Sequence, residues 1–127
     1  MAEQIAVPVK FGPLFAGDTG PAVTVVLLWD SGGYVNLEGG AYVEGIIRRW
    51  DPRRKAPLGP ELARAPMAIT DSAKGEAEYD WVLGAPASAV PIDPGWYVLQ
   101  VAVSFPNGRD QLSQRAIFEV YPSARAL

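Results

Sequence analysis

The 127 residues, 49% of them hydrophobic and 20% charged, fit one globular domain that is long enough to bury a core. The chain has neither cysteine nor histidine, which excludes disulfides, thiolate nucleophiles, Cys/His zinc sites and imidazole acid–base chemistry. Its formal net charge of −3 argues against a general attraction to polyanions such as nucleic acids.

Apolar and polar residues alternate with a period of two along most of the chain, which predicts strands and no helix of more than about a turn. Pro8 cannot donate to a ladder, so the first strand is expected at a sheet edge. The Arg/Pro-rich segment 51–63 is interpreted as a loop. The strands are expected at 5–11, 22–29, 41–50, 64–70, 76–83, 95–105 and 112–120.

The same alternation predicts which side chains of these strands face a core. The inward sets are Ile5, Val7, Val9 and Phe11; Ala77, Tyr79, Trp81 and Leu83; Tyr97, Leu99, Val101, Val103 and Phe105; and Leu112, Ala116, Phe118 and Val120. About seven short strands joined by turns rich in Gly and Pro predict an all-β fold, an Ig-like two-sheet antiparallel β-sandwich. We expect one domain over 1–127, with 1–4 and 122–127 as extended tails.

The stretch "PIDPGWYVLQV" contains the spacing expected of a tyrosine corner, formed by Asp93, Gly95 and Tyr97. In such a corner a Tyr at the start of a late strand bonds back to the backbone and fixes the crossover between sheets. The alternative is a buried Tyr after an ordinary Pro-Gly turn. Either way, its role is structural.

Two strands are apolar on both faces, whereas an antiparallel sheet with solvent behind it carries polar residues there. The outer faces contain Val26 and Leu28 in one strand and Trp96 and Val98 in the other. Apolar outer faces predict that a partner or another copy of the chain covers them. The alternative is that the loop at 50–63 folds over the sheet.

Carboxylates gather on one face of the strand at 76–83, in Glu76, Glu78 and Asp80, with Asp71 just before the turn. Such a row fits a solvated face that discourages edge-to-edge pairing. Calcium binding and a glycosidase-type acid–base pair are the alternatives weighed against it. We predict no catalytic, metal or cofactor site.

The segment "RRWDPRRK" holds five of the eleven basic residues of the chain. A nucleic-acid site would need basic residues along one continuous face with aromatics to stack on, and a basic domain. Here an aspartate interrupts the run, and the protein is acidic. We expect no direct nucleic-acid binding, and interpret Arg53, Arg54 and Lys55 as a solvated tip or a docking tip for an acidic neighbour.

Four segments in order resemble small Ig-like modules of tailed bacteriophages, similar to the N-terminal domain of phage upper baseplate proteins. They are "FAGDTGPAVTVVL" (15–27), "YVNLEGGAYVEGIIRRW" (34–50), "ITDSAKGEAEYDW" (69–81) and "PGWYVLQVAVSFPNGRDQ" (94–111). The Arg/Pro-rich segment at 51–66 is longer than in the family pattern. The resemblance implies a structural protein of the virion.

We therefore expect a non-enzymatic virion component of the tail or baseplate, binding other virion proteins or copies of itself. A capsid head decoration protein is the alternative within this class. A carbohydrate-binding module using Trp50, Trp96 or Tyr42 as a stacking platform is the alternative outside it. No apolar run has the roughly 20 residues of a membrane helix, and no signal peptide is recognisable, so synthesis in the host cytoplasm and no membrane contact are expected.

Overall fold

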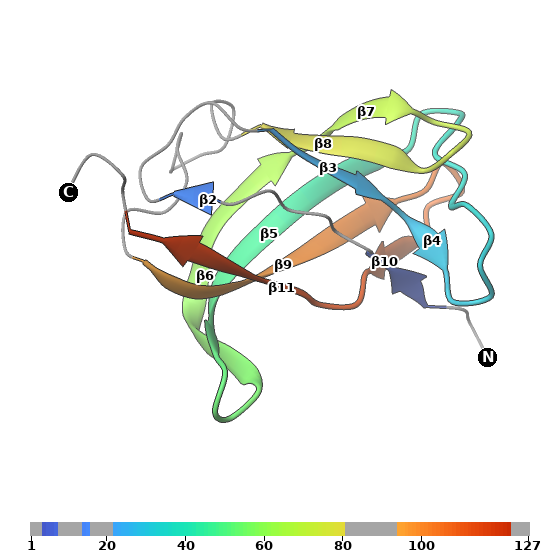
Figure 1. Cartoon of the computed structure of the whole chain (residues 1–127). Helices are drawn as coiled ribbons and strands as arrows, with labels where there is room; N and C mark the ends of the chain where they lie inside the picture. Colours follow the sequence, from blue (N-terminus) through green and yellow to red (C-terminus); the bar gives the residue numbers. More distant parts are fainter. Residues whose placement is uncertain (1–3, 8–13, 16–21, 81–93, 123–127) are drawn as a thin grey trace.

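The computed structural model describes residues 4–7, 14–15, 22–80 and 94–122. All regular structure in this part of the chain is β, arranged as two layers that pack face to face (Figure 1). None of its segments forms a helix that could cross a membrane. The expectation of an all-β sandwich is confirmed.

The larger layer is a sheet in which β9 (Gly95–Ser104) and β5 (Tyr42–Asp51) are the long central strands. Its order is β2-β11-β9-β5-β6, with β2 at Leu14–Phe15, β11 at Ala116–Tyr121 and β6 at Ala56–Pro66. A short strand, β10 (Asp110–Leu112), pairs with the end of β9 beside β11. The pairings are antiparallel except for β2 with β11, which is parallel.

The smaller layer has the order β3-β8-β7, formed by β3 (Ala22–Val26), β8 (Glu76–Asp80) and β7 (Ala68–Asp71). β1 (Ile5–Ala6) and β4 (Leu28–Trp29) form an additional two-stranded antiparallel pair. β4 follows β3 in the chain after a single residue. Each layer combines strands from both halves of the sequence, as in the Greek-key order of immunoglobulin-like sandwiches.

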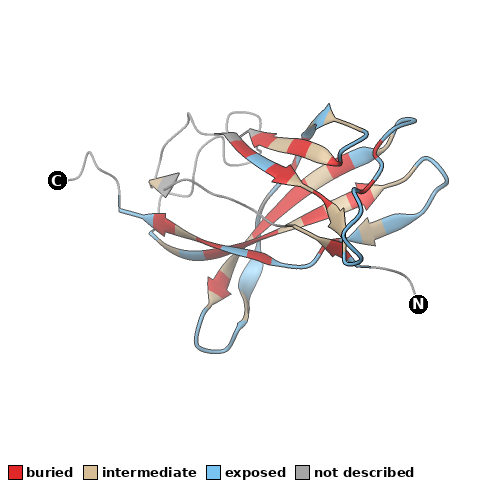
Figure 2. Cartoon of the chain, turned by 45° about the vertical axis from the view of Figure 1, so that its right-hand side comes forward, coloured by how far each residue is buried: buried red, intermediate tan, exposed pale blue. Residues whose placement is uncertain are grey.

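The core lies between the two layers, where the buried residues of both sheets face one another (Figure 2). Ten residues of the predicted inward sets are buried in this core: Ile5, Ala77, Tyr79, Tyr97, Leu99, Val101, Val103, Ala116, Phe118 and Val120. Val7 and Phe105 are partly buried and pack against this core. Val9, Phe11, Trp81 and Leu83 lie outside the described residues.

The segment 51–63 is not a loop, and the strand expected at 64–70 begins earlier. β6 starts at Ala56 and pairs with β5 along a hairpin that projects from the sandwich (Figure 1). β6 is the edge strand of its sheet, so its prolines interrupt no central ladder, and proline is tolerated there. The loop expected to fold over the sheet at 50–63 is therefore absent.

One residue separates β6 in the large sheet from β7 in the small one. Met67 is buried, and its backbone N–H donates to the carbonyl of Val43 at 2.8 Å. The bond holds the chain against β5 while the strand crosses from one layer to the other. The predicted fourth strand therefore serves both sheets.

Leu112 is exposed, although alternation predicts that it faces the core with Ala116. Leu112 pairs with Ala102 and Ala116 pairs with Leu99, so four steps along one strand oppose three along the other. This extra residue is a bulge, and a one-residue shift exchanges the faces of a strand. The predicted last strand is divided into β10 and β11 for that reason.

The predicted N-terminal tail is tied to the fold at its last residue. The carbonyl of Gln4 accepts a hydrogen bond from the backbone N–H of Asp30 at 3.0 Å, and the adjacent Ile5 is fully buried. The remaining tail residues, 1–3 and 123–127, are outside the described part of the chain, and Pro122 is exposed.

Candidate functional site

The residues predicted to form a partner interface lie on three separate surfaces. Val26 and Leu28 follow one another on β3 and β4, on the smaller side of the sandwich, and both are half-buried. Trp96 and Val98 belong to the outer face of the large sheet. The basic residues 53–55 occupy the tip of the β5–β6 hairpin. The structure does not combine these groups into one site.

Val98 is buried, with 1% of its surface exposed, so its assignment to an exposed interface is wrong. It is flanked by Arg48 on β5 and Ile117 on β11. The Nε atom of Arg48 is itself buried, so the stem of this arginine lies on the sheet and covers its neighbour.

Trp50 on the same face is also nearly buried, at 8% exposure. The guanidinium carbon of Arg115 stands 5.6 Å from the centre of its ring, within the range of a cation–π contact. Arginine side chains, and not a loop, therefore cover the middle of this outer face.

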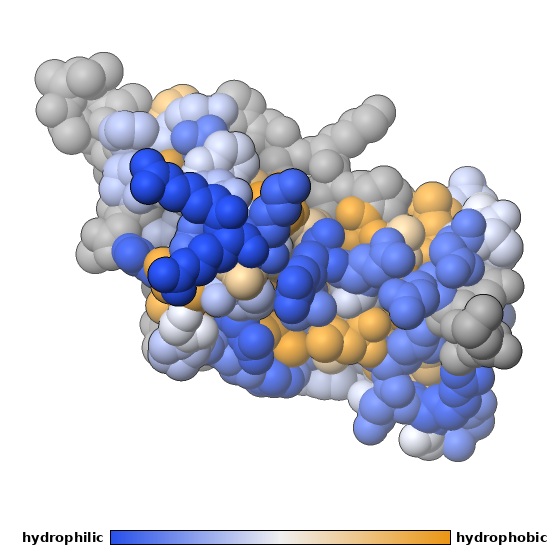
Figure 3. Space-filling model, turned by 90° about the horizontal axis from the view of Figure 1, so that it is seen from below, coloured by the Kyte–Doolittle hydropathy of each residue, from blue (hydrophilic) through white to orange (hydrophobic). Residues whose placement is uncertain are grey.

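A group of large apolar side chains remains exposed beside them, and we call it the outer patch: Trp96, Ile117 and Tyr121. Each has between 42% and 45% of its surface exposed. Ile117 and Tyr121 alternate on β11 with Glu119, which is paired with Trp96 on β9. The patch is therefore continuous across two adjacent strands around one carboxylate. From below, Figure 3 shows hydrophobic side chains interspersed with hydrophilic ones.

The predicted basic tip is exposed, and its conformation depends on Asp51. The Oδ1 atom of Asp51 accepts hydrogen bonds from the backbone N–H groups of Arg53 at 3.0 Å and Arg54 at 3.3 Å. Lys55 has a φ of 52°, the left-handed conformation that closes the turn. Asp51, which interrupts the basic run in the sequence, therefore stabilises the turn on which the basic residues lie.

Further up the hairpin, the outer surface carries an ion-pair group of Arg64 with Glu44 and Glu61. The hydrogen bond from Arg64 holds the pKa of the Glu61 carboxyl below its usual range. The same two carboxylates raise the pKa of Arg64 above its ordinary value. Because all three groups are solvent-accessible, the group fixes local geometry and contributes little to stability.

The acidic row has no metal-binding geometry in the part of the chain that the structure describes. Glu76 and Glu78 are half-buried on β8, and the hydroxyl of Thr70 donates to Glu76 Oε1 at 2.7 Å. No cluster of three acidic residues suited to a cation occurs among the described residues. The side chain of Asp80 is outside them.

The tyrosine corner is described in part. Tyr97 is buried, and its ring lies 5.8 Å from that of Phe118 with the two planes 23° apart. Gly95 has a φ of 145°, which favours glycine. Asp93 is outside the described residues, so the corner remains a prediction.

The aromatic residues expected to form a saccharide platform do not make one exposed surface. Trp50 is buried, and Tyr42 is exposed at the opposite end of the sheet from Trp96. Tyr42 pairs with Ser104, eight residues along β9 from Trp96, which corresponds to roughly 26 Å. A single sugar cannot contact both.

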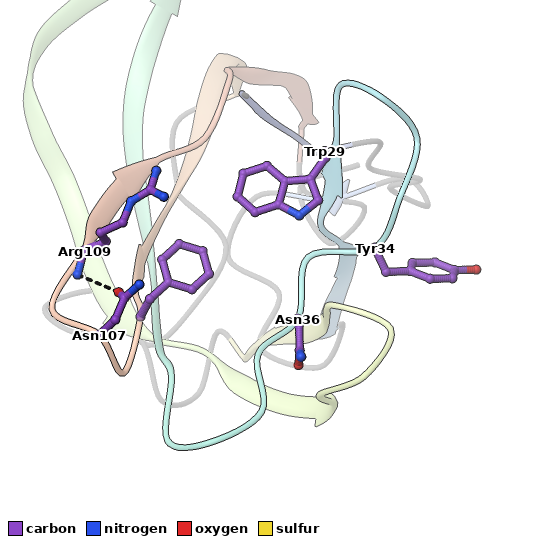
Figure 4. Close-up of a pocket in the computed structure, with 6 residues that line it drawn as sticks. Trp29, Tyr34, Asn36, Asn107 and Arg109 are labelled. Carbon is purple, nitrogen blue, oxygen red and sulfur yellow. Dashed lines mark hydrogen bonds between the residues drawn. The ribbon is translucent and has the colours of Figure 1, made fainter. Parts of the chain in front are cut away.

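A cleft that the sequence did not indicate lies at the end of the large sheet away from the hairpin tip. It has a volume of about 290 Å³. Three segments contribute its lining residues, which are Trp29, Tyr34, Asn36, Phe105, Asn107 and Arg109 (Figure 4). The segments are β4, the chain that follows it, and the turn between β9 and β10. These segments are far apart in the sequence and meet only in the folded chain.

The aromatic rings of the cleft lie nearly in one orientation. The ring centres of Trp29 and Phe105 are 6.2 Å apart and their planes differ by 15°. Stacked atoms in contact are about 3.5–4.0 Å apart, so at this separation the two rings do not overlap fully. Each ring therefore leaves part of its face free of the other.

The polar groups of the cleft are hydrogen-bond donors. Asn107 Oδ1 accepts from the backbone N–H of Arg109 at 3.0 Å, and Asn36 Oδ1 accepts from the N–H of Glu38 at 2.9 Å. These bonds orient both amides and leave their NH₂ groups available. Arg109 has no ion pair within the described part of the chain. Tyr34 points away from the other lining residues (Figure 4).

Comparison with known proteins adds a distant structural likeness to this picture. No protein-family profile matches the chain, and no curated protein matches it either. The crystal structure of CopC from Methylosinus trichosporium OB3b aligns over 95% of both chains, with 16% sequence identity and a TM-score of 0.48.

Proposed function

We propose that this protein is a non-enzymatic structural component of a bacteriophage virion that acts through protein–protein contacts in the tail or baseplate. The resemblance of four ordered sequence segments to phage Ig-like modules supports the virion assignment. The absence of cysteine and histidine from the sequence supports a role without catalysis. The chain is made in the host cytoplasm and incorporated into the particle there.

The outer patch is the observation that carries the contact role. Trp96, Ile117 and Tyr121 are exposed on adjacent strands of the large sheet, and Arg48 pairs with Val98 on the same face. Aromatic residues and arginines are enriched at the centres of protein interfaces, and Glu119 within the patch would need a cationic group on the partner. A rigid strand face also orders few side chains on binding, which keeps the entropic cost of association low.

The projecting hairpin supports the same role. Arg53, Arg54 and Lys55 extend beyond the sandwich at its tip, where they can meet an acidic neighbour in an assembly. Partners are other virion proteins or further copies of this chain. Nucleic acid is not a partner, because the cations of the tip form one isolated cluster on an acidic protein.

The test is mass spectrometry of purified particles after heads and tails have been separated. Recovery of the chain in the tail fraction supports the proposal. Recovery at high copy number in the head fraction would instead make it a capsid decoration protein, using the same patch against the shell. Absence from both fractions rejects a virion role.

A further inference from the structure

We propose that the cleft between β4 and the β9–β10 turn binds a saccharide that carries a carboxylate group. This site is separate from the outer patch and the hairpin tip. β9 runs from Gly95 near the hairpin to Ser104 at the cleft, so the two regions lie at opposite ends of the large sheet. The inference does not depend on the virion assignment.

The aromatic surface supplies the apolar half of the recognition. Trp29 and Phe105 both line the cleft with their ring planes 15° apart, so they offer two apolar ring faces of similar orientation. The faces of aromatic rings are electron-rich, and the C–H groups on one side of a pyranose ring carry partial positive charge. A sugar ring therefore packs on such a surface better than a charged or strongly hydrated group does.

The polar lining selects the charge of the ligand. The amides of Asn36 and Asn107 each use their oxygen on a backbone N–H and direct their NH₂ groups elsewhere. The guanidinium of Arg109 has donors and no acceptor. No carboxylate side chain lines the cleft. A lining with one cation, two amide donors and no carboxylate side chain favours a ligand that is rich in acceptors and negatively charged, and a guanidinium pairs bidentately with a carboxylate.

The size of the cleft limits the ligand to a small unit. A volume of about 290 Å³ lies at the low end of small-molecule sites, which span about 300–1,000 Å³. One carboxylated pyranose, such as a uronic acid unit at the end of a chain, matches this size. The segments that form the cleft are held by backbone bonds, including Phe105 N–H to the Arg109 carbonyl at 2.8 Å, so the site exists before binding.

The test is an NMR titration of the full-length, ¹⁵N-labelled protein with tri-galacturonate, and with galactotriose as the neutral counterpart. Shifts are expected for the indole N–H of Trp29 and for the side-chain amides of Asn36 and Asn107, with tri-galacturonate binding at least about tenfold more tightly. Arg109→Ala should remove this preference. Arg54→Ala makes the same charge change at the distant hairpin tip and should leave it unchanged.

Three results would overturn the inference. Equal binding of the acidic and neutral sugars would show that no carboxylate is recognised. Shifts that map to the outer patch or the hairpin would place the saccharide elsewhere. No shift with either sugar at tens of millimolar would mean that the cleft binds neither. Because Arg109 is exposed, its replacement should leave the fold intact, and the spectrum of the free variant verifies this directly.

Discussion

Gly45 and Tyr79 meet across the core of the sandwich, and the glycine leaves the space that the tyrosine ring fills. A Cβ atom at position 45 would stand 2.5 Å from Cδ2 and 2.8 Å from Cε2 of Tyr79. Gly45 is on β5 in the large sheet, and Tyr79 is on β8 in the small one. The ring of Tyr79 therefore packs directly on the backbone of Gly45, and this contact sets the distance between the two layers at this point.

Gly45→Ala should destabilise the protein by about 1–3 kcal/mol, because a buried ring between two sheets cannot move aside freely. Urea unfolding followed by tryptophan fluorescence measures the change. Gly33→Ala is the matched control, because a Cβ there meets nothing within 4 Å and the residue lacks a positive φ. An equal loss in both variants would contradict the packing explanation.

Tyr79 should also make the protein less stable in alkali. Burial raises the pKa of its phenol above the ordinary value of 10.0. The unfolded chain releases this proton near pH 10 while the folded chain retains it, so the stabilising contribution is complete below that pH. It is lost as the pH rises through the folded-state pKa.

Urea midpoints measured between pH 8 and pH 11.5 test this effect. The free energy of unfolding should fall less steeply with pH above 10 in Tyr79→Phe than in the wild type. The exposed Tyr34 provides the control, since Tyr34→Phe should leave the slope unchanged. Identical slopes for the wild type and Tyr79→Phe would exclude a contribution from this group.

Trp96 and Val98 form a matched pair on one face of β9 that differs in burial. Trp96 is 42% exposed and Val98 is 1% exposed. Trp96→Asp places a second carboxylate opposite Glu119 and should lower the free energy of unfolding by about 1 kcal/mol, yet leave the protein folded and prevent its incorporation into particles. Val98→Ala should cost about 1–3 kcal/mol, because it removes buried methyl groups and leaves a cavity beneath Arg48.

Thermal unfolding and particle incorporation of tagged variants separate the two effects. Unfolding of Trp96→Asp would place this side chain in the structural part of the sheet. Normal incorporation of a folded Trp96→Asp would remove the outer patch from the interface. An unchanged stability of Val98→Ala would show that the arginines do not seal this face.

Alternation predicts burial correctly where a strand runs without interruption, as for Tyr97, Leu99 and Val101. It fails at Leu112 because the adjacent bulge changes the face, and no residue type marks that bulge uniquely. It also misses the first half of β6, where prolines contradict strand formation locally. Edge position in the sheet removes the contradiction, and that position is a property of the whole fold.

The candidate sites were predictable only to the extent that they are local. The basic tip is one continuous segment, and the sequence places it correctly at a turn. The cleft brings Trp29 close to Asn107 and Arg109, which are far from it in the chain. Each of these residues lies in or beside a turn, and the sequence alone does not indicate that the turns meet. Trp29 meets the β9–β10 turn through the packing of its ring on Phe105, a contact between distant segments that composition and periodicity do not specify.

The bulge between β10 and β11 depends on Ser113, the one buried polar residue in the described part of the chain. Its Oγ accepts the backbone N–H of Val101 at 2.8 Å and donates to the carbonyl of Gln114 at 2.9 Å. Its own N–H donates to the Val101 carbonyl at 2.8 Å. The hydroxyl thus takes the place of a ladder acceptor that the extra residue has displaced.

Ser113→Ala should therefore cost about 1–3 kcal/mol, since it leaves the buried N–H of Val101 without an acceptor. Ser104→Ala, on the same sheet but with a half-buried side chain, should change stability by about 0.5 kcal/mol or less. Urea unfolding gives both values, and amide hydrogen exchange should show faster exchange at Val101 in Ser113→Ala alone. Unchanged protection of Val101 would mean that another acceptor replaces the hydroxyl, and that the bulge does not depend on this serine.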